Sequence, residues 1–397
     1  MMNDIAWGSD EELTDTQFYN RLSDIEFLSG LLKSTAFGSS PTILLTGVRG
    51  VGKTALIKKL KRDLNERYLI SYINLSQSNS FQTGNLDRSD IINLIFRELI
   101  KSAQEKGLTT TIKKIEKIIK TNNLKLDNIM SFEGIPIPKM GLEEDYSKLS
   151  EFVMDLPQKI YEECPEEIDG VLLFFDEFQN IKDLNEQMDG FLWYLRSKVQ
   201  SQKNVTYLFS GSMSLKDKLI EDIAGKNGAF GGRILTIEIK PFNQVTTRKY
   251  LQTNAPTLQF TKDGFDRFYK CTKGIPFYIN TFARLLPENE ELDKNKIINI
   301  FKKSLPLLAS HFTITWGRLT LKEQKIIVSL LDMPLKRVEI ANTLHVTSGS
   351  LARPLATLQN LVLVENDDGK YSIIDSILKY WLLNYYNEKG FYPFRSD

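Results

Sequence analysis

The sequence predicts an α/β protein in which a parallel sheet is covered by helices on both faces. The first observation is that short apolar runs alternate with segments whose apolar residues recur at helical spacing. The second is that these runs are apolar throughout, which is typical of strands buried on both faces of a parallel sheet. The expected strands cover residues 42–46, 68–75, 171–175, 205–209 and 234–239.

The expected helices of this α/β part fall before and between the strands. They cover residues 16–37, 53–66, 88–105, 110–120, 146–163 and 184–201. Residues 121–145 interrupt the alternation because they carry Gly134, Pro136, Pro138 and Gly141, which favour turns. We interpret this stretch as an insertion or long loop with a short hairpin.

Composition and charge limit the classes of function. The 397 residues suffice for two or three domains, and 51 Lys and Arg against 50 Asp and Glu give a net charge of +1. Contact with nucleic acid must therefore come from a local basic patch. Two distant cysteines, Cys164 and Cys271, and two histidines, His311 and His345, exclude a His/Cys metal cluster. We expect a cytoplasmic protein without a membrane span, because no apolar run reaches about 18 residues.

The sharpest motif is GVRGVGKT, which follows the first expected strand and fits G-x-x-x-x-G-K-[ST]. Its glycines permit backbone angles that turn successive amides toward phosphate oxygens, and the following helix adds its positive end. We expect Lys53 to reach the β- and γ-phosphates of ATP and Thr54 to bind Mg²⁺. The alternative is a chance match on a structural glycine-rich turn. The expected nucleotide-binding residues of this P-loop are Gly47, Val48, Arg49, Gly50, Val51, Gly52, Lys53, Thr54 and Ala55.

An acidic pair, Asp176 and Glu177, ends the strand expected at 171–175. A carboxylate at the carboxyl end of a buried strand lies beside the phosphate loop in an open α/β sheet. We expect Asp176 to hold Mg²⁺ and Glu177 to act as general base toward the attacking water. The alternative for Glu177 is that it caps the next helix.

Three further residues follow or precede later strands. Ser210 and Ser212 lie just past residues 205–209, where they would sense the γ-phosphate or, alternatively, cap the helix expected near Ser214. Arg233 precedes the last strand, where its guanidinium would reach phosphate in the same chain or in a neighbouring subunit. The alternative for Arg233 is a solvated surface residue.

Together these motifs resemble the prokaryotic AAA+/STAND ATPases of the archaeal-ATPase type, which are relatives of origin-recognition initiators. The matching segments are FYNRLSDIEFL, LLTGVRGVGKTALI (Walker A), LLFFDEFQ (Walker B), FSGSMS (sensor 1), GGRILTIEIKPF and CTKGIPFYI. The resemblance implies an ASCE/AAA+-like core, Arg21 near the adenine, and Pro276 packed against nucleotide from a helical lid. A sensor-2 arginine is not evident in that lid, where Lys273 and Gly274 stand beside Pro276. This departure favours a lid that gates the nucleotide and argues against fast hydrolysis.

The C-terminal stretch resembles a winged helix-turn-helix. Residues 337–346 would be its first helix, residues 347–361 its second, and the wing would turn at residues 367–369. Arg353 is the only basic residue on the second helix, and it is the expected DNA contact if the domain binds DNA. The wing carries mostly acidic residues, which do not neutralise DNA phosphates, so a structural or protein-docking role is the alternative.

These observations lead to two hypotheses of function. The first is a nucleotide-gated regulatory switch that binds Mg-ATP, hydrolyses it slowly and acts through a homo-oligomer or a separate effector protein. The second is a DNA-associated ATPase that resembles an initiator or loader. A third option is a scaffold that holds nucleotide without useful turnover. The expected parts are a tail at 1–15, a core at 16–242, a lid at 243–312 and a winged-helix domain at 313–397.

Overall fold

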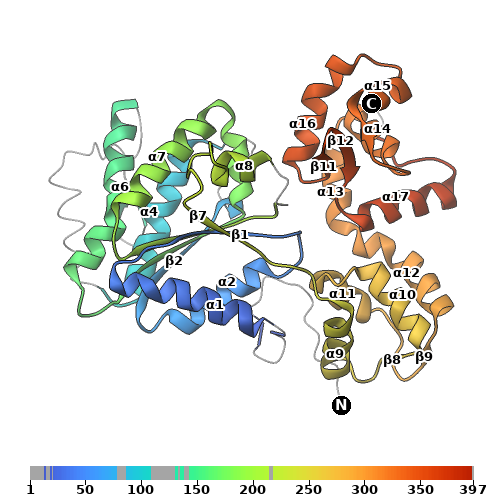
Figure 1. Ribbon diagram of the computed structural model, residues 1–397, viewed down its shortest axis with the longest axis horizontal. Helices are drawn as coiled ribbons and strands as arrows, with labels where there is room; N and C mark the ends of the chain where they lie inside the picture. Colours follow the sequence, from blue (N-terminus) through green and yellow to red (C-terminus); the bar gives the residue numbers. More distant parts are fainter. Residues whose placement is uncertain are drawn as a thin grey trace.

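The computed structural model describes residues 13–14, 18–19, 21–77, 86–108, 130–132, 135–137, 143–213 and 218–395. The helix predicted at 110–120 and most of the predicted tail lie outside these residues. The described chain forms an α/β core, a set of lid helices (residues 244–308) and a C-terminal unit (residues 310–395) (Figure 1). None of the described helices combines the length and apolar character that crossing a bilayer requires.

The core is built on the five-stranded parallel sheet that the sequence predicts. Its strand order is β2-β5-β6-β1-β7, and every pair is parallel. The strands are β1 (Thr42–Thr46), β2 (Tyr68–Asn74), β5 (Gly170–Asp176), β6 (Val205–Ser210) and β7 (Ile234–Glu238). Because β6 lies between β1 and β5, the loop after β6 emerges between the P-loop and the acidic pair.

Alternate residues of the central strands face two separate layers of helices. Leu172 and Phe174 pack with α1 (Leu22–Lys33) and α2 (Lys53–Leu64), whereas Leu173 and Phe175 pack into the opposite core. The sheet is therefore apolar on both faces, which explains why its strands are apolar throughout. Figure 1 shows α1 and α2 below the sheet and the core helices of the opposite layer on its other side. The helices of that opposite layer are α4 (Arg88–Glu105), α6 (Glu143–Glu163), α7 (Met188–Ser201) and α8 (Lys218–Ala224).

Short 3₁₀ segments and one hairpin complete the core. The helix predicted at 16–37 is shorter than expected, because α1 begins at Leu22 and ends in the 3₁₀ turn η1 (Ser34–Phe37). A 3₁₀ turn, η2 (Leu75–Gln77), follows β2, and the longer η3 (Phe178–Gln187) follows β5. The hairpin expected within 121–145 is present as β3 (Met130–Phe132) paired with β4 (Ile135–Ile137).

Four helices and one small parallel strand pair form the lid. A left-handed Lys273 and Gly274 end the second lid helix, and Pro276 begins the third at the position where its missing amide costs nothing. The lid elements are α9 (Gln244–Asn254), β8 (Gln259–Phe260), α10 (Lys262–Thr272), α11 (Pro276–Ala283), β9 (Glu291–Leu292) and α12 (Lys294–Leu308).

The C-terminal unit contains helices and a three-stranded sheet of order β10-β12-β11. A turn is present within the segment 367–369 where one is expected. Asp368 and Gly369 both have positive φ, and they join β11 to β12 as a two-residue turn. The helix predicted at 347–361 is broken into a 3₁₀ turn and a shorter helix, and Thr347 makes no side-chain cap. The winged-helix assignment itself stays a prediction. The elements are α13 (Ser310–Arg318), α14 (Leu321–Ser329), β10 (Leu335–Lys336), α15 (Arg337–Leu344), η4 (Ser348–Leu351), α16 (Ala352–Asn360), β11 (Val364–Asp367), β12 (Lys370–Ile373) and α17 (Ser376–Lys389).

The junction between the core and the lid depends on Gly274. Its φ is +72°, and a Cβ added there would lie 1.9 Å from the carbonyl oxygen of Phe242, whose amide donates to the carbonyl of Gly274. We predict that Gly274→Ala lowers the free energy of unfolding by about 1–3 kcal/mol, measured by thermal and denaturant unfolding. Gly190→Ala is the control, because Gly190 is helical and has nothing within 4 Å of the added Cβ. Equal stability of the two variants would contradict this account.

Candidate functional site

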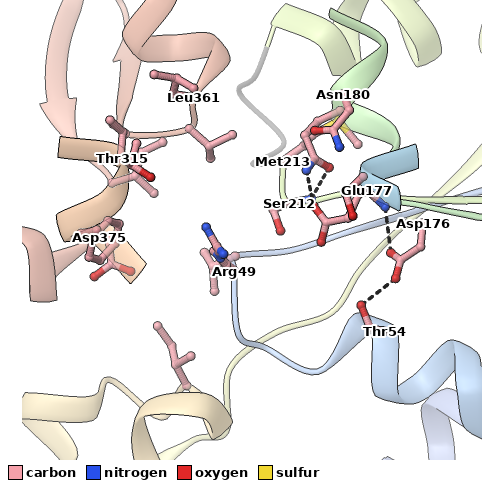
Figure 2. Close-up of a pocket in the computed structure, with 18 of the residues that line it drawn as sticks. Arg49, Thr54, Asp176, Glu177, Asn180, Ser212, Met213, Thr315, Leu361 and Asp375 are labelled. Carbon is pink, nitrogen blue, oxygen red and sulfur yellow. Dashed lines mark hydrogen bonds between the residues drawn. The ribbon is translucent and has the colours of Figure 1, made fainter. Parts of the chain in front are cut away.

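A cavity of about 920 Å³ lies where the core, the lid and the C-terminal unit meet. The P-loop and the acidic pair line one side of it, and Lys273 and Ile275 of the lid line another. Thr315, Leu361 and Asp375 line the side that belongs to the C-terminal unit. Figure 2 shows these last three facing Arg49 and the acidic pair across the cavity. A ligand that fills this space therefore contacts all three parts of the chain.

The P-loop requires its glycines for two different physical reasons. Gly47, Gly50 and Gly52 have φ angles of +142°, +79° and +101°, which side-chain-bearing residues rarely adopt. A Cβ on Gly47 would lie 2.5 Å from the carbonyl oxygen of Ile239, and one on Gly50 would lie 2.7 Å from Cβ of Phe277. The loop thus adopts a turned conformation and also permits close approach of its neighbours. It leads into α2, whose first turn contains Lys53, Thr54 and Ala55.

Lys53 is the first residue of α2 and is 6 % exposed. Its Nζ donates to the carbonyls of Gly47 (2.8 Å) and Val48 (3.1 Å) and to Ser212 Oγ (3.3 Å). Burial lowers the pKa of Lys53 to about 8, against the opposing effect of the nearby Glu177 and Asp176 carboxylates. Keeping the ammonium group charged in this buried position therefore costs free energy, and a bound anion would offset that cost.

Asp176 is 2 % exposed and accepts three hydrogen bonds. Its Oδ2 accepts from the hydroxyls of Thr54 (2.7 Å) and Tyr72 (2.8 Å), and its Oδ1 accepts from the Glu177 amide (3.0 Å). Tyr72 reaches it because β2 pairs with β5 in a register that sets Asn74 opposite Asp176. Burial, with a contribution from Asp176, raises the pKa of Tyr72, so the phenol remains a donor.

Glu177 lines the cavity next to Asp176 and has a left-handed backbone with φ +54°. It precedes η3, but its side chain makes no cap to that helix, so the structure gives no support to the capping alternative. Instead its Oε2 accepts a hydrogen bond from Nε2 of Gln179. Oε1 of Gln179 in turn accepts from the Ser212 amide at 3.0 Å.

The two predicted sensor serines lie in different environments. Ser212 lines the cavity and contacts Lys53. Ser210 is fully buried at the end of β6, and its hydroxyl has no hydrogen-bond partner among the described residues. Of the two, only Ser212 is placed to respond to a bound phosphate.

The residues implied by the family resemblance support the P-loop from outside the cavity. Arg21 Nη2 donates to the carbonyls of Val51 (3.1 Å) and Lys240 (2.8 Å), so Arg21 joins the start of the core to the P-loop and to the chain after β7. Pro276 begins α11, and the amide of the next residue, Phe277, donates to the carbonyl of Gly50 at 3.1 Å. Neither Arg21 nor Pro276 lines the cavity, and a direct contact of either with nucleotide stays a prediction.

The two remaining predicted arginines lie away from the cavity. Arg233 precedes β7, which runs parallel to β1 with Ile234 opposite Thr42, so Arg233 is at the sheet edge opposite the P-loop. This position does not fit the prediction that Arg233 reaches phosphate in its own chain. The prediction that it reaches phosphate in a neighbouring subunit stays a prediction. Arg353 is exposed on α16 of the C-terminal unit and does not line the cavity.

Several residues of the site were missed by the sequence analysis. Tyr72 was missed because the pairing of β2 with β5 is not local in sequence. Gln179 stands in the LLFFDEFQ segment, two residues after Glu177, and that spacing was an available signal. The contribution of the C-terminal unit, such as Thr315 and Arg318 on one face of α13, carries no sequence motif.

Comparison with known proteins shows the family and the fold. A family model described as an ATPase domain predominantly from Archaea matches residues 18–282. A Walker-type ATPase of Pyrococcus abyssi is 16% identical, with a TM-score of 0.63, over 94% of this chain and 99% of that one, and it shows the fold. No curated protein sequence matches the chain.

Two origin-recognition proteins of Aeropyrum pernix are more distant structural neighbours. The ORC1 protein, in complex with DNA, is 13% identical with a TM-score of 0.48, over 96% of this chain and 94% of that one. The ORC2 protein, in ADPNP–ADP complexes, is 12% identical with a TM-score of 0.49, over 96% of each chain.

The buried Lys53 predicts a pH dependence of nucleotide binding. In the free protein Lys53 has a lowered pKa of about 8, whereas a triphosphate beside it favours the ammonium form and raises that pKa. Binding should therefore take up a proton, and ATP affinity should fall as the pH rises through 8, by up to about tenfold per pH unit. Calorimetric titration at pH 7, 8 and 9 in buffers of different ionisation enthalpy measures both effects. Lys53→Arg stays charged throughout, so an equal pH dependence in that variant would assign the effect to another group.

Proposed function

This chain belongs to the family of ATPase domains found predominantly in Archaea, and on that premise we propose that it works as a nucleotide-gated regulatory switch. As a member of this family it is a P-loop ATP hydrolase. The switch takes ATP together with Mg²⁺ and hydrolyses it slowly. The bound nucleotide sets the arrangement of the lid and the C-terminal unit.

The single observation that carries this proposal is the composition of the cavity wall. Core, lid and C-terminal unit all contribute residues to one space, and the P-loop and acidic pair open into it. ATP and ADP differ by one phosphate, so they would make different contacts with the residues of the lid and the C-terminal unit that line the cavity. A difference in contact energy between states is what a ligand needs in order to shift a conformational equilibrium.

The residues at the end of β5 and the start of α2 fit a magnesium ion. Thr54 and Asp176 present hard oxygen ligands whose nearest atoms are 2.7 Å apart. Mg²⁺ in phosphate-transfer sites binds through one or two protein oxygens, with phosphate oxygens and water completing the coordination. Thr54 and Asp176 would hold the ion, which would neutralise charge on the phosphates.

The remaining residues divide the work of hydrolysis. Lys53 would leave the carbonyls of Gly47 and Val48 and bind phosphate oxygens. Glu177 would accept the proton from a water whose oxygen attacks the γ-phosphorus, while the bond to the ADP oxygen breaks. Arg233 lies at the opposite sheet edge, so it would reach phosphate only from a neighbouring subunit. A single chain would therefore lack an arginine contact to the phosphates from Arg233, which supports slow turnover.

A partly buried hydrogen bond links the lid to the C-terminal unit. The Tyr278 hydroxyl donates to Asp375, which also caps the start of α17. Burial raises the pKa of Tyr278, with a contribution from Asp375. Tyr278 directly follows Phe277, whose amide is bound to the P-loop at Gly50. A change at the P-loop therefore has a short physical route to the C-terminal unit.

Partners follow from the switch proposal. A homo-oligomer would let Arg233 act between subunits, and a separate effector protein would read the arrangement of the C-terminal unit. A cytoplasmic location is part of the proposal, and it is supported by Cys164 and Cys271, which are both buried and form no disulfide among the described residues.

Replacement of the proposed base tests the switch. Glu177→Gln should lower turnover by roughly 10²- to 10⁴-fold, because it removes the proton acceptor, and should leave ATP affinity close to wild type. The trapped ATP complex should differ from the ADP complex in radius of gyration or molecular mass, measured by small-angle scattering and light scattering. Glu186→Gln, which changes an exposed carboxylate in the same 3₁₀ segment, is the control. Identical size and shape in both nucleotide states would rule out the switch.

A second candidate function is DNA association, and one observation favours it. Lys336 and Lys370 are direct cross-strand partners, and Arg337 follows Lys336. All three are exposed, as is Arg353 on α16. The structure thus gathers more positive charge around β10 than the second helix alone carries, which partly offsets the acidic wing.

Salt-dependent binding of duplex DNA distinguishes this second function. If the cluster contacts phosphates, Arg353→Ala and Lys370→Ala should each weaken binding and reduce the slope of log affinity against log salt by about one. Fluorescence anisotropy across a salt series measures both quantities. Lys303→Ala, an exposed lysine on the lid, should leave binding unchanged. If wild-type protein binds no duplex even at low salt, DNA association should be abandoned.

A further inference from the structure

We propose that Gln179 is the positioning residue for Glu177, a role that rests on the proposed function of Glu177 as general base. Gln179 lies at the start of η3, two residues after Glu177. Its side-chain amide donates one hydrogen bond and accepts another. Nε2 donates to Glu177 Oε2, and Oε1 accepts from the Ser212 amide. The amide side chain thereby fixes one carboxylate oxygen of Glu177 and leaves Oε1 to accept from water.

This pair of bonds belongs to a longer chain of contacts. Lys53 Nζ donates to Ser212 Oγ at 3.3 Å, the Ser212 amide donates to Gln179 at 3.0 Å, and Gln179 donates to Glu177. Lys53 is the residue that a phosphate would draw away. The position of Glu177 is therefore connected, through Gln179 and Ser212, to whether the P-loop holds a nucleotide.

The loop after β6 is shaped to receive the Gln179 side chain. A Cβ on Gly211 would lie 2.7 Å from Oε1 of Gln179 and 3.3 Å from its backbone nitrogen. The Gly211 amide is bound to the carbonyl of Leu45 at 3.1 Å, so this glycine has little freedom to move aside. Glu177 itself has a left-handed backbone, which a surrounding network must stabilise. The tight packing at Gly211 and the left-handed backbone of Glu177 agree with the two hydrogen bonds and point to the same role.

Two substitutions separate the bonds of Gln179. Gln179→Leu removes both, whereas Gln179→Glu keeps an acceptor for the Ser212 amide and loses the donor to Glu177. If Gln179 orients Glu177, both variants should lower kcat by roughly 10- to 100-fold, because a small misplacement of a reacting group has that cost. The KM for ATP and the affinity for ATP measured by fluorescence should stay within about threefold of wild type. Gln187→Leu, an exposed residue at the end of the same 3₁₀ segment, should retain full activity.

A double-mutant cycle with Glu177→Gln shows whether Gln179 acts through Glu177. In the Glu177→Gln background, single-turnover rates should fall no further when Gln179→Leu is added, because the residue being positioned is already gone. An equal loss in both backgrounds, or a raised KM with unchanged kcat, would overturn the proposal. Full turnover in Gln179→Leu beside an inactive Glu177→Gln would overturn it while leaving the proposed function intact. Full turnover in Glu177→Gln itself would instead remove the base assignment on which the proposal rests.

Discussion

The site depends on one geometric constraint, which is that parallel strands end at the same edge of their sheet. β1 leads into the P-loop, β5 ends in Asp176, and β6 ends at the loop that carries Ser212. Because β6 lies between the other two, its loop lies between the phosphate cradle and the acidic pair. The bond between Thr54 and Asp176 then joins the helix after β1 to the end of β5. A chain without this strand order could carry the same motifs and not bring them together.

The sequence predicted those parts of the site whose physics is local. The P-loop glycines and the acidic pair were recognisable because a short stretch of chain suffices for each. The partners of the acidic pair were not recognisable, since Tyr72 depends on the register between β2 and β5. The same limit applies to Arg233, whose distance from the P-loop in its own chain follows from the direction of β7. Sequence spacing says nothing about which edge of a sheet a residue occupies.

The helix α11 connects three parts of the chain through two adjacent residues. The Phe277 amide is bound to Gly50 of the P-loop, and Tyr278 is bound to Asp375 of the C-terminal unit. Gly50 has no side chain, so Phe277 packs directly against the loop backbone. Rigid elements in direct contact transmit displacement better than flexible ones, because packed interiors are not continuously deformable. The family resemblance placed Pro276 in a helical lid, but it did not indicate that the residues after Pro276 contact both neighbours.

The hydrogen bonds of Lys53 have a consequence for the backbone of the P-loop. Its Nζ donates to the carbonyls of Gly47 and Val48 at 2.8 and 3.1 Å. These contacts offset part of the cost of burying a cation, a cost that also lowers the pKa of Lys53 to about 8. The same side chain therefore stabilises the turned backbone of the loop, so a substitution that removes the ammonium group would disturb the shape of the phosphate cradle as well as its charge.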